Sequence, residues 1–324
     1  MAQGEVTTIA PSRLKIVAEK LYKGGYGSSI GLVALFIIGS FLSPYFLTTI
    51  NILNLLRQVC IYGFMSMGMT LVILAGGIDL SVGGIMTASS VLAAVLAGRV
   101  DTFLVFLLPT LLGCMFGLIN GVIIAKFKVE SFVITLGTQF IAFGLGYAIC
   151  GGKTVLPADF PFVLDFLMNG FVGPIPFPII LLFALYIFFA FIMSYTSFGR
   201  YIHAIGGNEK AVRFCGVNVD LMKIAIYTIS GVLSGFAGVM MLSRATAGDP
   251  TIGIGIVLTI IASVIVGGNH FIGGIGNVGF TLIGLLILGT ISNLLTILGV
   301  VFYVQQIISG IIVIVAVVIS TRLE

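Results

Sequence analysis

The sequence predicts an all-α membrane protein of about ten transmembrane helices in one bundle, with glycine-broken helices in its core and both chain ends in the cytoplasm. Three observations predict this class. The mean hydropathy is +1.25 and only 8% of residues are charged, whereas soluble domains carry about a quarter charged residues. Apolar runs close to the ~20 residues that a spanning helix needs follow one another along nearly the whole chain. Lysine and arginine are unevenly distributed between the segments that join these runs.

Ten apolar runs are long enough to be considered as spans. They cover about 28–46, 54–75, 80–98, 103–125, 131–150, 177–194, 221–242, 254–267, 276–297 and 300–320. Glycine clusters interrupt the second, third and eighth of them.

The positive charges predict the orientation, because cytoplasmic segments carry an excess of lysine and arginine. With the N-terminus inside, eleven of the fifteen lysines and arginines fall in inner segments. This bias predicts an even number of spans and a cytoplasmic C-terminus. Segments 151–176 and 243–253 are then outer loops, and 195–220 is the longest inner loop.

The chain divides into three regions. Residues 1–27 are polar and amphipathic, which favours a cytoplasmic tail with an interfacial helix over a cleavable signal peptide. Residues 28–320 form the transmembrane domain, and residues 321–324 form the cytoplasmic C-terminus.

Glycines recur at helical spacing in two of the predicted spans. Gly113, Gly117 and Gly121 share one helix face, as do Gly231 and Gly235. Small residues at this spacing let helix backbones approach closely in lipid. This is a packing signal that any tight helical bundle would use.

A first break, segment 76–84, lies between two apolar stretches and has a glycine pair at each end. Its acid, Asp79, is costly at membrane depth, where ionisable groups are usually functional. Asp79 can act as the N-cap of the next helix by accepting from the backbone N–H of Ser81 or Val82. It can also contact substrate, and the two roles are compatible. The second break, segment 267–274, also has a glycine pair at each end, which is a weak signal of an internal repeat.

A short helix is predicted over 208–215 in the longest inner loop. Asn208 is a favourable N-cap, Glu209 and Arg213 are spaced for an i,i+4 pair, and Gly216 suits a helix stop. A helix of this length is marginal in water, so we expect it to become ordered against a partner protein. A capped surface helix without a partner is the alternative.

The sequence contains little that indicates an enzyme or a metal-binding protein. Cys60, Cys114, Cys150 and Cys215 form no metal-ligand pair and suit apolar packing, and His203 and His270 lie far apart. The stretch 151–154 is similar to part of a phosphate loop, but the required first glycine is displaced by one residue and no strand precedes it. We therefore expect no catalytic residues, no metal site and no ATPase site in this chain.

Two stretches resemble one known family. Residues 68–83, GMTLVILAGGIDLSVG, resemble the signature of ribose-type sugar permeases, the membrane subunits of bacterial ABC importers. Residues 199–211, GRYIHAIGGNEKA, resemble the loop through which that family contacts its ATPase. The resemblance runs from the first span to the last, in order and spacing.

The resemblance implies both the assembly and the site residues. Such permeases work in the bacterial inner membrane as a pair of identical or sister subunits, with a periplasmic binding protein that delivers the sugar and an ATP-binding cassette subunit that binds ATP and Mg. No cofactor on this chain and no nucleic acid are expected. The translocation pathway would include Gly76, Gly77, Asp79, Ser81 and Gly83. ATPase coupling would use Gly207, Asn208, Glu209, Ala211, Arg213 and Gly216.

One departure leaves the identity of the sugar open. Where ribose-type permeases usually carry Glu-Leu-Asp-Ala-Ile-Ala, residues 257–262 read VLTIIA, so Val257 and Thr259 replace both acids. An ion-coupled secondary transporter of a small polar solute is the alternative function, because it too has broken helices. It would need ionisable groups at membrane depth, and Asp79 is the one clear acid in the glycine-rich core. An ATPase subunit in the purified complex would separate the two.

Overall fold

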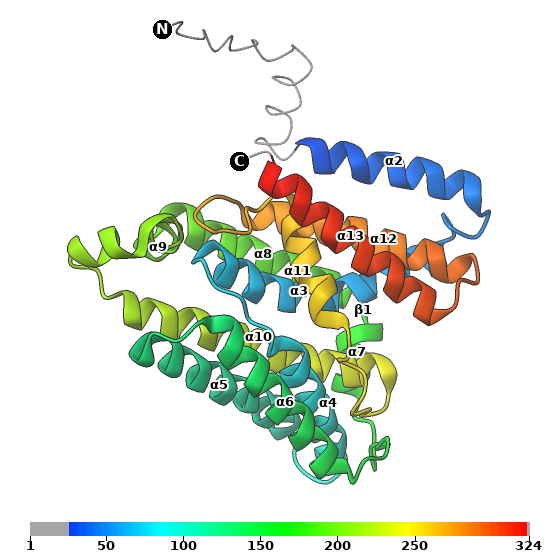
Figure 1. Cartoon of the computed structure of the whole chain (residues 1–324). Helices are drawn as coiled ribbons and strands as arrows, with labels where there is room; N and C mark the ends of the chain where they lie inside the picture. The colour runs from blue at the N-terminus through cyan, green and yellow to red at the C-terminus, as the bar shows by residue number, and fades with distance from the viewer. Residues whose placement is uncertain (1–25, 323–324) are drawn as a thin grey trace, which may run out of the picture.

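The computed structural model describes residues 26–322, which form a bundle of α-helices with one two-stranded hairpin (Figure 1). The elements are α2 (Tyr26–Leu42), α3 (Thr49–Leu74), α4 (Val82–Leu96), α5 (Thr102–Phe127), α6 (Ser131–Cys150), α7 (Phe162–Asn169), β1 (Phe171–Val172), β2 (Ile175–Pro176), α8 (Phe177–Tyr195), α9 (Ser197–Phe214), α10 (Val219–Ala245), α11 (Ile256–Gly267), α12 (Val278–Ile297) and α13 (Phe302–Arg322). The predicted all-α class is confirmed. The tail helix predicted within 1–27 falls almost entirely outside the described residues.

Each of the ten predicted spans contains a helix at nearly the predicted position. Six of them, α3, α5, α6, α8, α10 and α12, are long and apolar enough to cross a membrane. The other four include α4 and α11, which have 15 and 12 residues. The crossing number of ten and the inward orientation of both ends stay predictions.

Helices α3, α4 and α10 form the centre of the bundle. Almost every side chain of α4 is buried, and α10 packs against α5, α4 and α3. Polar caps define where helices begin: the Asp101 side chain accepts from the N–H of Phe103 at α5, and that of Asn218 accepts from Leu221 at α10. Such caps satisfy N–H groups that have no partner within the helix.

The two predicted glycine faces pack against each other, which sequence spacing alone did not show. A Cβ at Gly113 would overlap the carbonyl oxygen of Gly231, and a Cβ at Gly231 would overlap that of Gly113. Gly117 meets the Tyr227 carbonyl in the same way. Helices α5 and α10 are therefore in direct backbone contact along their seam.

The first break is shorter than predicted. Gly83 and Gly84 lie inside α4, where a Cβ on either would crowd α6 or the segment before α11. These glycines permit close packing and do not interrupt a helix. Only Gly76, with φ +80°, has the backbone conformation that favours glycine in this break.

The two ends of the bundle differ (Figure 1). Helix α9 projects at one end, whereas α7 and the β1–β2 hairpin lie at the other. The two predicted outer segments contact each other there, because Val155 and Gly248 form an antiparallel bridge and Ser243 donates to the Leu164 carbonyl. This pairing is consistent with one common side for both segments.

The α5–α10 seam yields a test of the fold. Gly231→Leu should lower the melting temperature of the detergent-purified protein by several degrees or prevent its recovery, because overpacking costs about 1–3 kcal/mol or more. Gly137→Leu on α6 is the matched control, since nothing lies within 4 Å of a Cβ at Gly137. Equal melting temperatures for both variants, measured by size-exclusion chromatography after heating, would contradict the seam.

Candidate functional site

Asp79 is fully buried and held by hydroxyl groups (0% exposed). Its Oδ1 accepts from the N–H of Ser81 at 3.0 Å and from the Ser81 hydroxyl at 2.5 Å. Its Oδ2 accepts from the Ser230 hydroxyl of α10 at 2.7 Å. The predicted bond from the Ser81 N–H is present, but the N-cap of α4 is Ser81 and not Asp79 as predicted. Asp79 also joins the start of α4 to α10.

The polar cage around Asp79 extends to α5 but contains no opposite charge. The Asn120 side-chain N–H donates to the Ser81 hydroxyl at 2.9 Å. Among the described residues, none of the ion pairs involves Asp79. The carboxylate is therefore bound by neutral donors, which suits a structural brace.

A cavity of about 660 Å³ reaches the first break from the α9 side. Gly76 and Gly77 line it, whereas Asp79, Ser81 and Gly83 do not. Its charged lining residues are Lys128, Glu130, Glu209, Lys210, Arg213 and Lys223. The structure thus separates the predicted pathway residues into a glycine pair that lines the cavity and a buried group.

The second break is braced by Asn269, which is 0% exposed. Its side-chain N–H donates to the Val264 carbonyl at 2.9 Å and to the Thr281 hydroxyl at 3.0 Å. Its oxygen accepts from the N–H of Asn277 at 2.7 Å. A buried polar side chain therefore fixes each of the two breaks.

Both breaks and α9 meet in one place, which we call the glycine junction (Leu74, Gly76, Gly206, Gly273 and Gly274). The N–H of Gly274 donates to the Leu74 carbonyl at 2.9 Å. A Cβ at Gly206 would overlap that same carbonyl and the backbone of Gly274.

A side chain of α9 also reaches the second break at this point. Nδ1 of His203 lies 3.0 Å from the carbonyl oxygen of Gly274. Because a carbonyl oxygen only accepts, this nitrogen donates. The sequence did not predict the glycine junction, although the pairs Gly76–Gly77, Gly206–Gly207 and Gly273–Gly274 stand out in it.

The predicted short helix is the last part of α9. Asn208 has non-helical angles (φ −157°, ψ 93°), and its side chain accepts from the N–H of Ala211 at 3.0 Å. Gly216, with φ +82°, ends the helix. The cap and the stop agree with the prediction. The bend was not predicted, because the helical residues from Ser197 to Gly207 were expected to be loop.

Ion pairs attach this short helix to the base of α10. Glu209 pairs with Arg213 at 2.9 Å and with Lys223 at 2.7 Å, and Arg213 also pairs with Asp220. Val212 is buried beneath them. The expectation that the helix has order only against a partner protein is therefore wrong, because contacts within the chain already hold it.

The pairing changes two pKa values. Partial burial alone would raise the pKa of Glu209, but hydrogen bonds from Lys223 and Arg213 outweigh it and lower the pKa below its ordinary value. The pKa of Arg213 is raised by its hydrogen bonds to Asp220 and Glu209. Glu209 therefore stays charged below the pH at which an ordinary glutamate takes up a proton.

One exposed side chain on α9 was not predicted from the sequence. Phe214, the last residue of α9, is 91% exposed. The sequence feature that could have predicted it is a large aromatic residue in a polar loop, just before the glycine at which the helix stops. Asp220 and Lys223 were detectable as opposite charges just beyond the same stop.

The described residues contain no group of three histidine, cysteine, aspartate or glutamate side chains that could hold a metal ion. Lys153, in the stretch similar to a phosphate loop, is exposed beside the bridge between Val155 and Gly248. The site is therefore composed of backbone contacts, hydroxyl groups and ion pairs.

The chain is similar to known membrane permeases along most of its length. A family model described as branched-chain amino acid transport system / permease component matches residues 51–317. The ribose import permease protein of Bacillus subtilis (strain 168) is 40% identical over 297 residues, which cover 91% of this chain and 92% of that protein. No solved structure gives a significant match.

Two further relatives from Escherichia coli (strain K12) are sugar permeases by name. The L-arabinose transport system permease protein is 36% identical over 294 residues, covering 90% of this chain and 89% of that protein. The D-allose transport system permease protein is 38% identical over 301 residues, covering 92% and 91%. The chain is therefore a multi-pass membrane protein that belongs to this family of transport-system permease components.

Proposed function

We propose that this chain is the membrane permease subunit of a bacterial ABC importer for a sugar. A periplasmic binding protein delivers the sugar, and a separate ATP-binding cassette subunit binds ATP and Mg. The observation that carries the proposal is similarity to sugar permeases along about nine-tenths of the chain. The subunit works in the inner membrane beside a second permease copy or a sister chain, surrounded by lipid.

The end of α9 offers a docking surface for the ATPase. Gly207, Asn208, Lys210, Ala211 and Phe214 are exposed there. A large aromatic side chain beside small and basic residues suits insertion into a groove of a partner protein. Glu209 and Arg213 face α10 instead, so they hold the docking surface in place.

Two routes connect this surface to the breaks. The first runs through α10, whose Lys223 binds Glu209 and whose Ser230 binds Asp79. The second runs along α9 to the glycine junction, where Gly206 touches the Leu74 carbonyl. Backbone contacts transmit displacement well because they contain no flexible side chain.

The structure gives little support to the secondary transporter. Coupling to an ion needs a titrating or ion-binding group with access to a pathway. Asp79 is enclosed by Ser81 and Ser230 and lines none of the described cavities. Asp79 therefore fits a brace better than a proton carrier.

Substitution of Asp79 tests this reading. Asp79→Asn should keep most ATP-driven uptake in proteoliposomes, because the amide keeps an acceptor for Ser81 and can donate to the Ser230 hydroxyl. Asp79→Leu should lose uptake, since each buried partner left unpaired costs about 1–3 kcal/mol. Asp165→Leu, at an exposed position on α7, is the control for folding and should leave the melting temperature unchanged. Loss of uptake in folded Asp79→Asn, with wild-type uptake abolished by a proton uncoupler at fixed ATP, would support the secondary transporter.

Substitution of Glu209 tests the coupling route. Exposed ion pairs contribute only about 0–1 kcal/mol, and the Glu209 side chain is 37% exposed, so Glu209→Ala should insert and fold. We expect sugar transported per ATP hydrolysed to fall severalfold, because the docking surface loses its tie to Lys223. Arg213→Glu should act in the same direction.

Phe214→Ala should weaken co-purification with the ATPase subunit without changing the melting temperature of the permease. Phe162→Ala at the opposite end is its control, since Phe162 is 75% exposed on α7. Normal uptake and a normal complex in Glu209→Ala, Arg213→Glu and Phe214→Ala would refute the coupling role of α9.

A further inference from the structure

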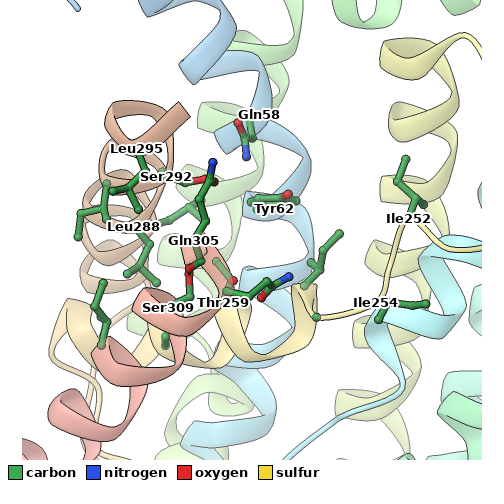
Figure 2. A pocket seen from close by; sticks show the side chains of 18 of the residues that line it. Gln58, Tyr62, Ile252, Ile254, Thr259, Leu288, Ser292, Leu295, Gln305 and Ser309 are labelled. Atoms are coloured by element: carbon green, nitrogen blue, oxygen red, sulfur yellow. The ribbon is translucent and has the colours of Figure 1, made fainter. Parts of the chain in front are cut away.

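A second cavity of about 170 Å³ lies between α3, α11, α12 and α13 (Figure 2). Its polar lining comprises Gln58, Tyr62, Thr259, Ser292, Gln305, Gln306 and Ser309. Figure 2 shows Gln58 and Tyr62 on one side and Ser292, Gln305 and Ser309 on the other. The remaining walls are mainly aliphatic, including Leu285, Leu288 and Ile256.

The cavity lies toward the hairpin end of the bundle, opposite α9. Gln58 follows Arg57, whose guanidinium stands over the Phe171 ring of β1 at 5.8 Å from its centroid. Ile252 and Ile254, from the segment before α11, form part of the wall. By the predicted topology this is the outer side, from which an imported solute arrives.

The lining indicates an uncharged ligand. None of the cavity's lining residues is charged. Amide and hydroxyl groups spaced around aliphatic walls bind a neutral ligand that both donates and accepts hydrogen bonds. A water-sized group needs roughly 10–15 Å³ of such volume, so the cavity has room for on the order of ten such groups, about the number of non-hydrogen atoms in a monosaccharide.

Some of these polar groups are free to bind. Within the described part of the chain, the Thr259 hydroxyl and the Gln306 amide have no hydrogen-bond partner, whereas Gln305 donates to the Val300 carbonyl at 2.8 Å. Gly255, with φ +84°, leaves space that a Cβ would take from the Gln306 side chain. The two free groups face the cavity from α11 and α13.

We propose that this cavity holds the transported solute on the outer half of the permease, and that the solute is an uncharged molecule with several hydroxyl groups. Thr259 and Gln306 are its specificity-determining contacts. This inference rests on the proposed function for its biological meaning, but direct binding tests it independently of transport.

Thiol protection measures binding to the cavity. In a background with Cys60, Cys114, Cys150 and Cys215 replaced by alanine, Thr259→Cys is alkylated in the purified full-length permease with and without excess D-ribose, L-arabinose or D-allose. At least one sugar should slow alkylation about tenfold, as expected for a ligand that covers the thiol at near-saturating concentration. Ser309→Cys provides a second position in case Thr259→Cys fails to fold.

The control is Thr296→Cys, which lies on an exposed position outside the cavity and should show no protection. Protection at Thr259→Cys and Ser309→Cys by added phospholipid, unchanged by any sugar, would identify a lipid site and overturn the inference. Absence of protection by every sugar at both positions would overturn it equally.

Uptake separates this inference from the proposed function. With the full importer, Thr259→Val should change the ratio of maximal uptake rates between two sugars by about tenfold, the usual effect of leaving one polar contact unmade. Thr259→Ser should restore the ratio. Unchanged ratios in Thr259→Val with normal uptake would refute the site and leave the importer function intact. Sugar protection without ATP-driven uptake would support the site and refute the importer function.

Discussion

The carbonyl group of Leu74, the backbone of Gly206 and the backbone of Gly274 touch without any side chain between them. This contact joins the end of α3, the loop after α11 and the bend of α9, and it requires glycine because a Cβ on Gly206 would overlap the carbonyl oxygen. The α5–α10 seam relies on the same constraint at Gly113 and Gly231. In lipid, apolar burial does not drive helices together, so close backbone approach has to supply much of the packing energy. The packing of these helices therefore depends on the positions of the glycines, where the absence of a side chain lets two backbones touch.

Helices α3 and α11 connect the two regions to which function is assigned. Both helices line the cavity at the hairpin end, through Gln58 of α3 and Thr259 of α11. Helix α3 ends at the glycine junction, and the loop that follows α11 reaches it. Between these ends the hydroxyl groups of Ser66 and Ser263 lie 3.0 Å apart, so the two helices are tied at mid-height. A displacement of α9 against Leu74 and Gly274 would thus reach the cavity through two braced helices. Under the proposed function, this gives a physical route between the ATPase docking surface on α9 and the cavity at the opposite end of the bundle.

The sequence was sufficient for the ten apolar helices, because apolar runs and caps such as Asn208 are local signals. It did not predict α7 or the first part of α9, which were expected to be loop. It was insufficient for contacts between distant segments. Gly83 was predicted to belong to a helix break, but it lies inside α4 and lets this helix pack against the segment before α11. Glu209 was correctly paired with Arg213, but the tie to Lys223 depends on a turn that brings the start of α10 alongside. Thr259 was noted as a departure from a family pattern, and only the fold places it in a cavity.

The central proposal is that α9 contacts the ATPase. Because the segments predicted to be outer loops meet at the hairpin end, we propose that this opposite end receives the binding protein. Photo-cross-linking tests it most directly, with a photoreactive amino acid at Phe214 or at Phe162 in the assembled importer. Both positions are highly exposed, at 91% and 75%, and lie at opposite ends of the bundle. We predict that the probe at Phe214 cross-links to the ATP-binding cassette subunit and that the probe at Phe162 cross-links to the periplasmic binding protein. Cross-linking of Phe214 to the binding protein, or of Phe162 to the ATPase, would contradict the account.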